Sequence, residues 1–202
     1  MSPADLLGRY PLISDQVNKD QLAVILRELE QILPKVDGAV VEFGCYIGTT
    51  SLFIRRLLDT QGDSREFHVY DSFEGLPPKT TEDNSRAGEQ FKAGELKVTR
   101  KQYMQQFQKA ALRPPIVHKG WFSELTAGDV PESIAFAFLD GDFYTSIRDS
   151  LKLVLPRLQP GGVIVIDDYA REALPGAAKA VHEQLDSRRI TTSHNLGIFR
   201  SR

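Results

Sequence analysis

The stretch AVVEFGCYIGTTSLFIRRLL, residues 39–58, decides the fold of this chain. Its first five residues form an apolar run of strand length, and the apolar residues after Gly48 recur with a helical period. Gly44 permits a tight turn after the strand, and Gly48 lets the backbone come close to a ligand at the positive end of a helix. We therefore predict a strand over Ala39–Phe43 and a helix over Thr49–Leu58, joined by a glycine turn.

Strands and helices alternate along the rest of the chain, as they do in a doubly wound α/β protein. An opening helix is expected over Asp20–Leu33, where the apolar residues share one helical face before Pro34. The other expected elements are helices over Gln102–Leu112, Tyr144–Leu158 and Ala177–Leu185, strands over Glu66–Tyr70, Ile116–Lys119, Ala135–Leu139 and Val163–Ile166, and a hairpin of Ile190–Ser193 with Gly197–Arg200. The predicted fold class is α/β, with a single doubly wound, Rossmann-like sheet that is mostly parallel and has an antiparallel C-terminal hairpin.

The composition agrees with one soluble domain over residues 1–202, which begins with an N-terminal helical segment over residues 1–35. Hydrophobic residues make up 41% of the chain, enough for one substantial core. The net charge is −2 and the basic residues are dispersed, which argues against a nucleic-acid partner. No apolar stretch reaches the ~20 residues of a membrane span. The N-terminus lacks a signal-peptide pattern and the lone Cys45 suits a reducing compartment, so we expect a cytoplasmic protein.

Acidic residues close two of the apolar strands. Asp140 and Asp142 follow one apolar run, and Asp167 and Asp168 follow the next. If the two strands are neighbours, their ends lie about 4.8 Å apart, and carboxylates that close together raise each other's pKa. A hard divalent cation such as Mg²⁺ prefers oxygen ligands and relieves that repulsion. We therefore predict a metal site at Asp140, Asp167 and Asp168.

The glycine turn differs from the dinucleotide-binding fingerprint. Its spacing is E-x-G-x-x-x-G rather than G-x-G-x-x-G, which disfavours a pyrophosphate ligand. A ligand with one carboxylate and one ammonium fits better, with Glu42 taking the ammonium directly or through water. The second strand ends in Asp71, about where a ribose-binding carboxylate is expected, although Asp71 alternatively caps the turn that follows it. S-adenosylmethionine has the polarity that these residues require.

Five motifs, taken in order, resemble the macrocin O-methyltransferase (TylF-like) family. They are VEFGCYIGTTS at residues 41–51, VYDSFEGLP at 69–77, KGWF at 119–122, LDGDFYTSI at 139–147 and IDDY at 166–169. The resemblance covers nearly the whole chain. It implies a class I methyltransferase, dependent on S-adenosylmethionine and magnesium, that methylates sugar hydroxyls of macrolides and related glycosylated natural products.

The resemblance also implies residue roles. Asp140, Asp167 and Asp168 would hold Mg²⁺ or another hard divalent cation, and Asp142 would be the general base. The expected catalytic residues are therefore Asp142 and Asp140. The expected cofactor-binding residues are Glu42, Gly44, Tyr46, Gly48, Thr49, Asp71 on the ribose, Ser72, Trp121 beside adenine, and Asp140. The expected partner is a small-molecule hydroxyl acceptor, and the chain is either a monomer or a homo-oligomer.

The implied chemistry leaves two side chains with alternative roles. Coordination to a metal would lower the pKa of a sugar or catechol-like hydroxyl, and Asp142 would then accept the proton. The alternative is that Asp142 caps the helix expected to begin at Tyr144. Tyr144 itself either packs on the cofactor or fills the corner between strand and helix.

The length of the chain bears on the acceptor substrate. The chain is shorter than expected for antibiotic-tailoring members, before the first strand and between Pro77 and Gln102. The segment Pro77–Gly94 has no sustained apolar period, and we predict a lid over the acceptor pocket. Two other classes compete: an NAD-dependent oxidoreductase, weakened by the missing fingerprint and by the lack of a Tyr-x-x-x-Lys pair, and a non-catalytic S-adenosylmethionine-binding module, which would need no acid cluster.

Overall fold

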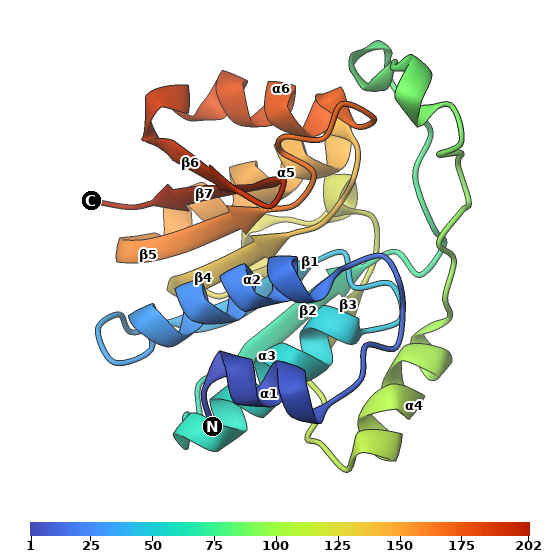
Figure 1. Cartoon of the computed structure of the whole chain (residues 1–202). Helices are drawn as coiled ribbons and strands as arrows, with labels where there is room; N and C mark the ends of the chain where they lie inside the picture. The colour runs from blue at the N-terminus through green and yellow to red at the C-terminus, as the bar shows by residue number, and fades with distance from the viewer.

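A seven-stranded sheet forms the centre of the computed structural model, which describes residues 1–202. Its strands are β1 (Ala39–Phe43), β2 (Phe67–Asp71), β3 (Ile116–Lys119), β4 (Ile134–Leu139), β5 (Leu158–Ile166), β6 (Ile190–Ser193) and β7 (Leu196–Arg200). They lie in the order β3-β2-β1-β4-β5-β7-β6 (Figure 1). The strands β1 to β5 are parallel, whereas β7 runs antiparallel to both β5 and β6. The predicted mostly parallel sheet with an antiparallel C-terminal hairpin is confirmed.

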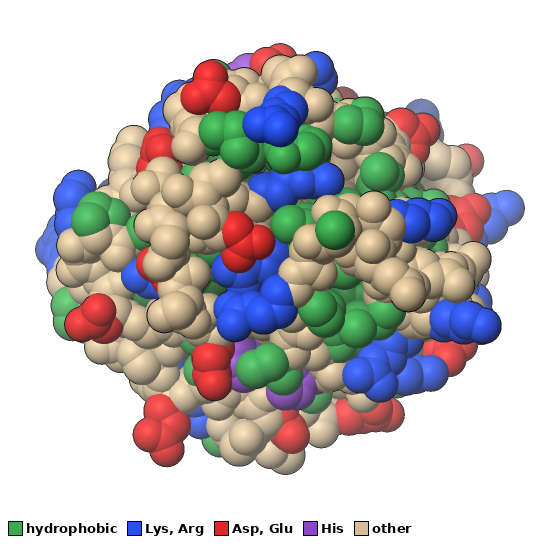
Figure 2. All heavy atoms as spheres, turned by 90° about the horizontal axis from the view of Figure 1, so that it is seen from below, with side chains coloured by type: hydrophobic (Ala, Val, Ile, Leu, Met, Phe, Trp, Pro, Cys, Tyr) green, Lys and Arg blue, Asp and Glu red, His purple; other side chains and the backbone are tan.

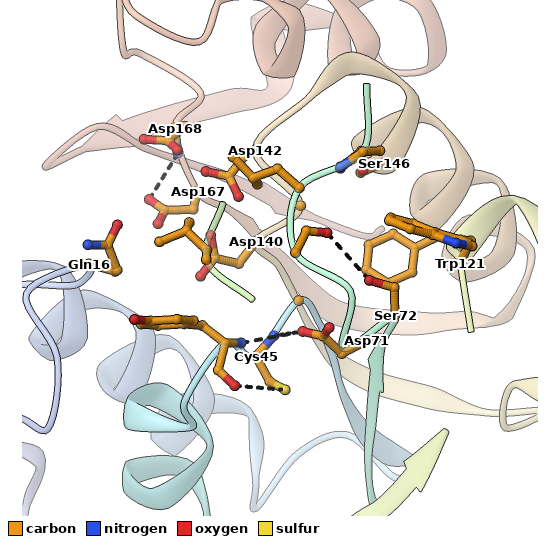
Figure 3. Close-up of a pocket in the computed structure, with 18 of the residues that line it drawn as sticks. Gln16, Cys45, Asp71, Ser72, Trp121, Asp140, Asp142, Ser146, Asp167 and Asp168 are labelled. Atoms are coloured by element: carbon orange, nitrogen blue, oxygen red, sulfur yellow. Dashed lines mark hydrogen bonds between the residues drawn. The ribbon is translucent and has the colours of Figure 1, made fainter. Parts of the chain in front are cut away.

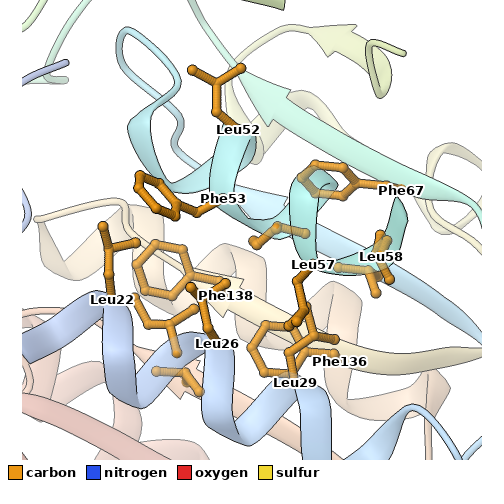
Figure 4. Close-up of a cluster of buried hydrophobic side chains, with 14 of the residues drawn as sticks. Leu22, Leu26, Leu29, Leu52, Phe53, Leu57, Leu58, Phe67, Phe136 and Phe138 are labelled. Atoms are coloured by element: carbon orange, nitrogen blue, oxygen red, sulfur yellow. The ribbon is translucent and has the colours of Figure 1, made fainter. Parts of the chain in front are cut away.

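Helices cover both faces of the sheet. They are α1 (Pro3–Arg9), α2 (Lys19–Ile32), α3 (Thr49–Gln61), α4 (Arg100–Ala110), α5 (Tyr144–Val154) and α6 (Pro175–Gln184). Successive strand residues point to opposite faces, so Val40 packs with α2 and α3 while Val41 packs with α5 and α6. Figure 4 shows the first of these two cores, where leucines of α2 and α3 face Phe136 and Phe138 of β4. Each such fully buried side chain contributes about 1.5–3 kcal/mol to folding.

Local signals set the ends of the first helices. Asn18 accepts from the backbone N–H of Gln21, whose side chain accepts from the Asn18 N–H, and this capping box starts α2. Helix α3 begins after Gly48 and ends before Gly62, both of which have positive φ. The helix runs three residues beyond the predicted end at Leu58, because Gly62 is the residue that supplies the left-handed cap. No helix of the chain combines the length and apolar character that a bilayer crossing requires.

The largest difference from the prediction lies between α5 and β5. The helix was expected to reach Leu158 and the strand to begin at Val163, but α5 ends at Val154 and β5 already begins at Leu158. Pro156 lies in the intervening 3₁₀ turn, where its missing N–H costs nothing. Leu158 pairs with Ile134 of β4, and a bulge in the ladder accommodates the Pro-Gly-Gly sequence that follows.

Smaller differences occur at the two ends of the chain. Helix α1 was not predicted as a separate element, although Ser2 forms a capping box and Pro3 occupies the first helical position. In the C-terminal hairpin the turn consists of His194 and Asn195 alone, both with positive φ, so Leu196 belongs to β7 rather than to the turn. On the face shown in Figure 2, basic, acidic and apolar side chains are mixed.

The segment between β2 and α4 forms a closed loop rather than an extended connection. Leu76 donates to the Glu95 carbonyl at 2.8 Å and accepts from Gly94 at 2.9 Å, which closes the base of the loop. Within it are two 3₁₀ turns, Thr81–Asp83 and Arg86–Gly88. Figure 1 shows this green segment passing along one side of the molecule to α4.

Candidate active site

A cavity opens at the carboxyl ends of β1, β2, β4 and β5 (Figure 3). From β1 the chain proceeds outward to β2 and β3 on one side, and β4 and β5 lie on the other side. This is a switch point of the topology, where ligands bind in open α/β sheets. The cavity encloses about 770 Å³ of space, part of which is open solvent.

Most of the predicted site residues line this cavity. They are Gly44, Tyr46, Asp71, Ser72, Trp121, Asp140, Asp142, Asp167 and Asp168. Glu42, Gly48 and Thr49 do not line it. Gly48 is the N-cap of α3, and the buried Thr49 hydroxyl lies 2.8 Å from the hydroxyl of Ser14 in the connection between α1 and α2.

Four non-glycine residues near the strand ends have left-handed backbone conformations. They are Tyr46 after β1, Phe73 after β2, Asp142 after β4 and Asp168 after β5, with φ angles of 46°, 56°, 59° and 54°. A side chain makes this conformation unfavourable, and such residues gather where a site needs a special geometry. Four such residues at the strand ends around one cavity make it the candidate functional site.

Asp71 connects the end of β2 to the glycine turn after β1. Its Oδ2 accepts from the backbone N–H groups of Cys45 and Tyr46 at 2.8 and 3.3 Å, and its Oδ1 accepts from Phe73 at 2.7 Å. The predicted alternative, that Asp71 caps the turn that follows it, therefore holds as a structural role. The side chain still lines the cavity, so a ribose interaction stays a prediction.

Glu42 is buried beneath the site, with only 1% of its surface exposed. The Ser51 hydroxyl donates to Glu42 Oε2 at 2.6 Å. Burial raises the pKa of Glu42 to about 8, against the opposing effect of the Ser51 hydrogen bond. A direct contact between Glu42 and a ligand ammonium is not available in this arrangement, and the route through water stays a prediction.

The four aspartates of the two acidic motifs come together on one side of the cavity. Leu139 and Ile166 are register partners in β4 and β5, so Asp140 and Asp167, the next residues, lie side by side. Figure 3 shows Asp142 and Asp168 beside them. The neighbouring basic group is Arg171, which donates to Asp168 Oδ1 at 3.0 Å.

Burial and mutual repulsion make ionisation of this cluster unfavourable. Burial, with the charges of Asp167 and Asp142, raises the pKa of Asp140 well above its usual range. Burial and the Asp168 charge raise the pKa of Asp167 to about 7, although hydrogen bonds from the Asp168 backbone and the Asp140 carboxyl lower it. The pKa of Asp142 is also raised, mainly by burial and then by Asp168. A single arginine does not balance four carboxylates.

Asp142 does not cap α5. The N-cap of α5 is Phe143, which has no capping side chain, and the Tyr144 backbone N–H donates at 2.7 Å to Asp83 of the loop after β2. The alternative role for Asp142 is therefore wrong, and its carboxylate, which has no hydrogen-bonding partner, lines the cavity. Tyr144 does not line the cavity, because its hydroxyl donates to Glu183 of α6 at 2.6 Å.

Aromatic side chains form the wall opposite the acids. Trp121 and Phe122 follow β3 closely and line the cavity. Figure 3 places Trp121 beside Ser72 and Asp71, on the far side from Asp168. A flat apolar surface next to a hydrogen-bonding carboxylate is what an adenine and its ribose require.

Several residues of the cavity were not predicted. Arg171 and Gln16 line the acid side, and Leu76 and Leu96 line the wall formed by the loop after β2. Arg171 follows Asp168 by three residues, a spacing that suggests an ion pair across the turn. Gln16 has no local signal, because only the tertiary fold carries the connection before α2 to this edge of the sheet.

The cavity fits S-adenosylmethionine in the order of its chemical groups. A glycine turn with a buried acid beneath it lies at one end, Asp71 lies in the middle, and Trp121 lies beyond. The acids fit a hard divalent cation by donor type and charge, since they offer carboxylate oxygens whose repulsion Arg171 compensates only in part. Their side chains do not, however, stand as a ready-made group of three metal ligands.

Comparisons with known proteins place the chain in a family. A model of the macrocin O-methyltransferase (TylF) family matches residues 14–196. The chain is similar to the 8-demethyl-8-(2,3-dimethoxy-alpha-L-rhamnosyl)-tetracenomycin-C 4'-O-methyltransferase of Streptomyces olivaceus, with 36% identity over 73% of this chain and 58% of the relative. It is also similar to the mycinamicin III 3''-O-methyltransferase of Micromonospora griseorubida, with 32% identity over 77% of this chain and 63% of the relative. The chain thus spans less than two thirds of the length of these two relatives.

Solved structures show the same fold. The O-methyltransferase NovP superposes with a TM-score of 0.74 at 23% identity, over 91% of this chain and 83% of that one. The calicheamicin methyltransferase CalS11 superposes with a TM-score of 0.75 at 18% identity, over 98% of this chain and 89% of that one. The class I methyltransferase fold expected from the five motifs is therefore confirmed.

Proposed function

Because this chain belongs to the macrocin O-methyltransferase (TylF) family, we propose that it transfers a methyl group from S-adenosylmethionine to a sugar hydroxyl of a glycosylated natural product. We further propose that the reaction depends on a divalent cation held by Asp140, Asp167 and Asp168. The acceptor class is proposed from the similar proteins, both of which methylate oxygen and one of which is named for a rhamnosyl compound.

One observation carries this proposal: a single cavity is lined on one side by the glycine turn, Asp71 and Trp121 and on the other side by four aspartates. The glycine turn, Asp71 and Trp121 offer a polar turn, a carboxylate and an aromatic face in the order that the donor requires. The acids at the ends of β4 and β5 lie across the cavity from the aromatic wall. A donor bound along the first side would extend its methyl group toward the second, where the acceptor oxygen would lie.

The sulfonium methyl group is already reactive, so the protein has chiefly to align the acceptor oxygen and remove its proton. A divalent cation at the acids would supply positive charge that favours loss of the hydroxyl proton. Asp142 is suited to accept that proton, because its carboxylate lines the cavity among the acids and has no other partner. Asp71 and Trp121 would hold the ribose and adenine in place.

Methyl transfer to rhamnosylated and other deoxysugar-bearing acceptors, followed by mass spectrometry, tests the proposal. We expect a methylated product with S-adenosylmethionine and Mg²⁺, loss of product in EDTA, and recovery when Mg²⁺ is restored. Calorimetry should detect binding of S-adenosylhomocysteine and no binding of NADH. Undiminished transfer in EDTA would remove the metal from the proposal but keep the methyltransferase, whereas binding of NADH alone would favour an oxidoreductase.

A further inference from the structure

A glutamine that is distant in the sequence, and that does not line the cavity, contacts the acid cluster. The side-chain Nε2 of Gln21, in the first turn of α2, donates to Asp167 Oδ1 at 3.1 Å. The two residues are 146 positions apart, and they are 8% and 5% exposed. A buried hydrogen bond to a carboxylate at a strand end constrains that carboxylate more than a surface contact would.

The orientation of the Gln21 amide follows from a second contact. The Asn18 backbone N–H donates to Gln21 Oε1 at 3.1 Å, as the side-chain half of the capping box of α2. A backbone N–H can only donate, so the amide oxygen has to face Asn18 and the amide NH₂ has to face Asp167. The start of α2 thereby aims a hydrogen-bond donor at the acid cluster.

The contact also determines which oxygen of Asp167 faces the cavity. Oδ1 accepts from Gln21 and from the backbone N–H of Asp168, the second at 2.9 Å (Figure 3, dashed line). Two N–H donors on one oxygen hold the plane of the carboxylate and leave Oδ2 without an N–H donor, with the Asp140 carboxyl as its neighbour. Oδ2 is then the oxygen available to a ligand beside Asp140.

The connection that precedes α2 belongs to the same site. Gln16 lines the cavity on the acid side, and Ser14 contacts Thr49 at the start of α3. The segment before α2 therefore runs from the glycine turn to the acid cluster. The C-terminal end of this segment is held in place by the start of α2, where Gln21 contacts Asp167.

We propose that Gln21 is a positioning residue of the acid cluster, which holds Asp167 with Oδ2 toward the cavity and so increases the affinity of the cluster for a divalent cation. This inference rests on the metal dependence proposed above. Removal of a group that hydrogen-bonds to a metal ligand, and does not itself bind the metal, typically lowers metal affinity by about 10–100-fold. Gln21 acts through Asp167 and touches neither donor nor acceptor.

Mn²⁺ binding to the whole protein, measured by calorimetry and by electron paramagnetic resonance without any acceptor, tests the inference. Gln21→Met keeps the length of the side chain but removes its donor, and we expect its Mn²⁺ affinity to fall about 10–100-fold. Binding of S-adenosylhomocysteine, measured on the same sample, should stay within about twofold of wild type, because no cofactor-side contact changes.

Asn18→Ala is the matched control. It removes the capping oxygen that accepts from the Gln21 backbone and should lower the melting temperature, but the Asn18 backbone N–H still orients the Gln21 amide. Its Mn²⁺ affinity should therefore match wild type. Unchanged affinity in Gln21→Met, or an equal loss in both variants, overturns the inference. A wild-type protein that binds S-adenosylhomocysteine but no Mn²⁺ overturns it as well, through failure of the proposed metal dependence, and leaves the methyltransferase proposal standing.

Discussion

The Cβ atom that Gly44 lacks would lie 1.9 Å from the backbone carbonyl oxygen of Asp140. The turn after β1 and the end of β4 thus pack backbone against backbone. This contact joins the glycine-turn side of the cavity to its acidic side. Gly44 also has a φ of +86°, which other residues adopt only with strain. The position tolerates glycine alone.

We predict that Gly44→Ala destabilises the protein by more than the left-handed backbone alone explains. Gly62 has a similar φ of +67°, but no atom lies within 4 Å of the place that its Cβ would take, so Gly62→Ala should cost only about 1–2 kcal/mol. Gly44→Ala adds a clash with backbone that cannot rotate away. Urea unfolding of both variants measures the difference, and equal costs would show that the turn relaxes around the new methyl group.

Asp71→Asn should weaken cofactor binding and stability together. Both carboxylate oxygens accept backbone N–H groups, from Cys45 and Tyr46 on one side and from Phe73 on the other. Asparagine has one oxygen, so its NH₂ group has to face a donor, at a cost of about 1–3 kcal/mol. We expect the rise in melting temperature caused by S-adenosylhomocysteine to disappear.

A distant turn provides the control for that variant. Asp63 also accepts a backbone N–H, from Arg65 at 2.9 Å, but it lies at the opposite end of the sheet from the cavity. Asp63→Asn should lower the melting temperature and keep the full shift with S-adenosylhomocysteine. If Asp71→Asn keeps that shift too, Asp71 is only a cap of the turn.

The fold was predictable because its signals are local. The apolar run Ala39–Phe43 and the glycines after it specify a strand, a turn and a helix without knowledge of the rest of the chain. The acids at the ends of β4 and β5 were predictable for the same reason, since charged residues end an apolar strand wherever it lies in the sheet. The error at Leu158 arose because its pairing with Ile134 is a tertiary contact.

The unpredicted part of the site depends on contacts between distant residues. Gln21 and Asp83 look like ordinary polar residues of a helix start and a loop, and their partners are 146 and 61 positions away. Asp142 shows that a local signal can also predict a contact that a distant residue makes instead. Its position before a helix suggests a cap, but Asp83 supplies that hydrogen bond instead.

The buried Glu42 should make stability fall with pH. Its pKa is raised from 4.5 to about 8 in the folded protein, so between these values the folded state keeps a proton that the unfolded state has lost. The stabilisation is complete below pH 4.5 and is lost as the pH rises to about 8, at no more than about 1.4 kcal/mol per pH unit. Glu42→Gln removes the titrating group and keeps a side-chain oxygen that can accept from the Ser51 hydroxyl.

We therefore expect the free energy of unfolding of Glu42→Gln, minus that of wild type, to increase from pH 4.5 to pH 8 and to be level above it. Urea unfolding across this range measures the difference, in which the contributions of the other acids largely cancel. A difference that does not change with pH would mean that Glu42 is ionised in the folded protein at neutral pH.

Asp83 should hold the loop after β2 against the body of the protein. The residue is fully buried, and it accepts from Tyr144 at 2.7 Å and from the backbone and hydroxyl of Thr80 at 2.8 Å. Asp83→Ala removes these contacts, and we expect limited proteolysis within residues 77–94 to become several-fold faster. The exposed neighbour Glu89 has no such contacts, so Glu89→Ala should be cleaved like wild type.

The same assay tests whether this loop is a lid. If it closes over the acceptor, S-adenosylhomocysteine and Mg²⁺ should slow cleavage of the wild-type loop. Protection should be smaller in Asp83→Ala, because the anchored position is less populated. Cleavage at equal rates with and without ligands would make the loop a fixed wall of the cavity.

Two variants should separate proton transfer from metal binding within the acid cluster. Asp142 has no protein partner, whereas Asp167 is held by Gln21 and by the Asp168 backbone. If Asp142 is the base, Asp142→Asn should lower kcat by about 10²–10⁴-fold and leave binding of Mn²⁺ and S-adenosylhomocysteine nearly unchanged. Asp167→Asn should instead weaken Mn²⁺ binding, and raising the Mg²⁺ concentration should restore part of its methyl transfer. Both variants should stay folded, because each removes a charge from a cluster of mutually repelling carboxylates. Equal loss of Mn²⁺ affinity in the two variants would make Asp142 a metal ligand, and full activity of Asp142→Asn would exclude it as the base.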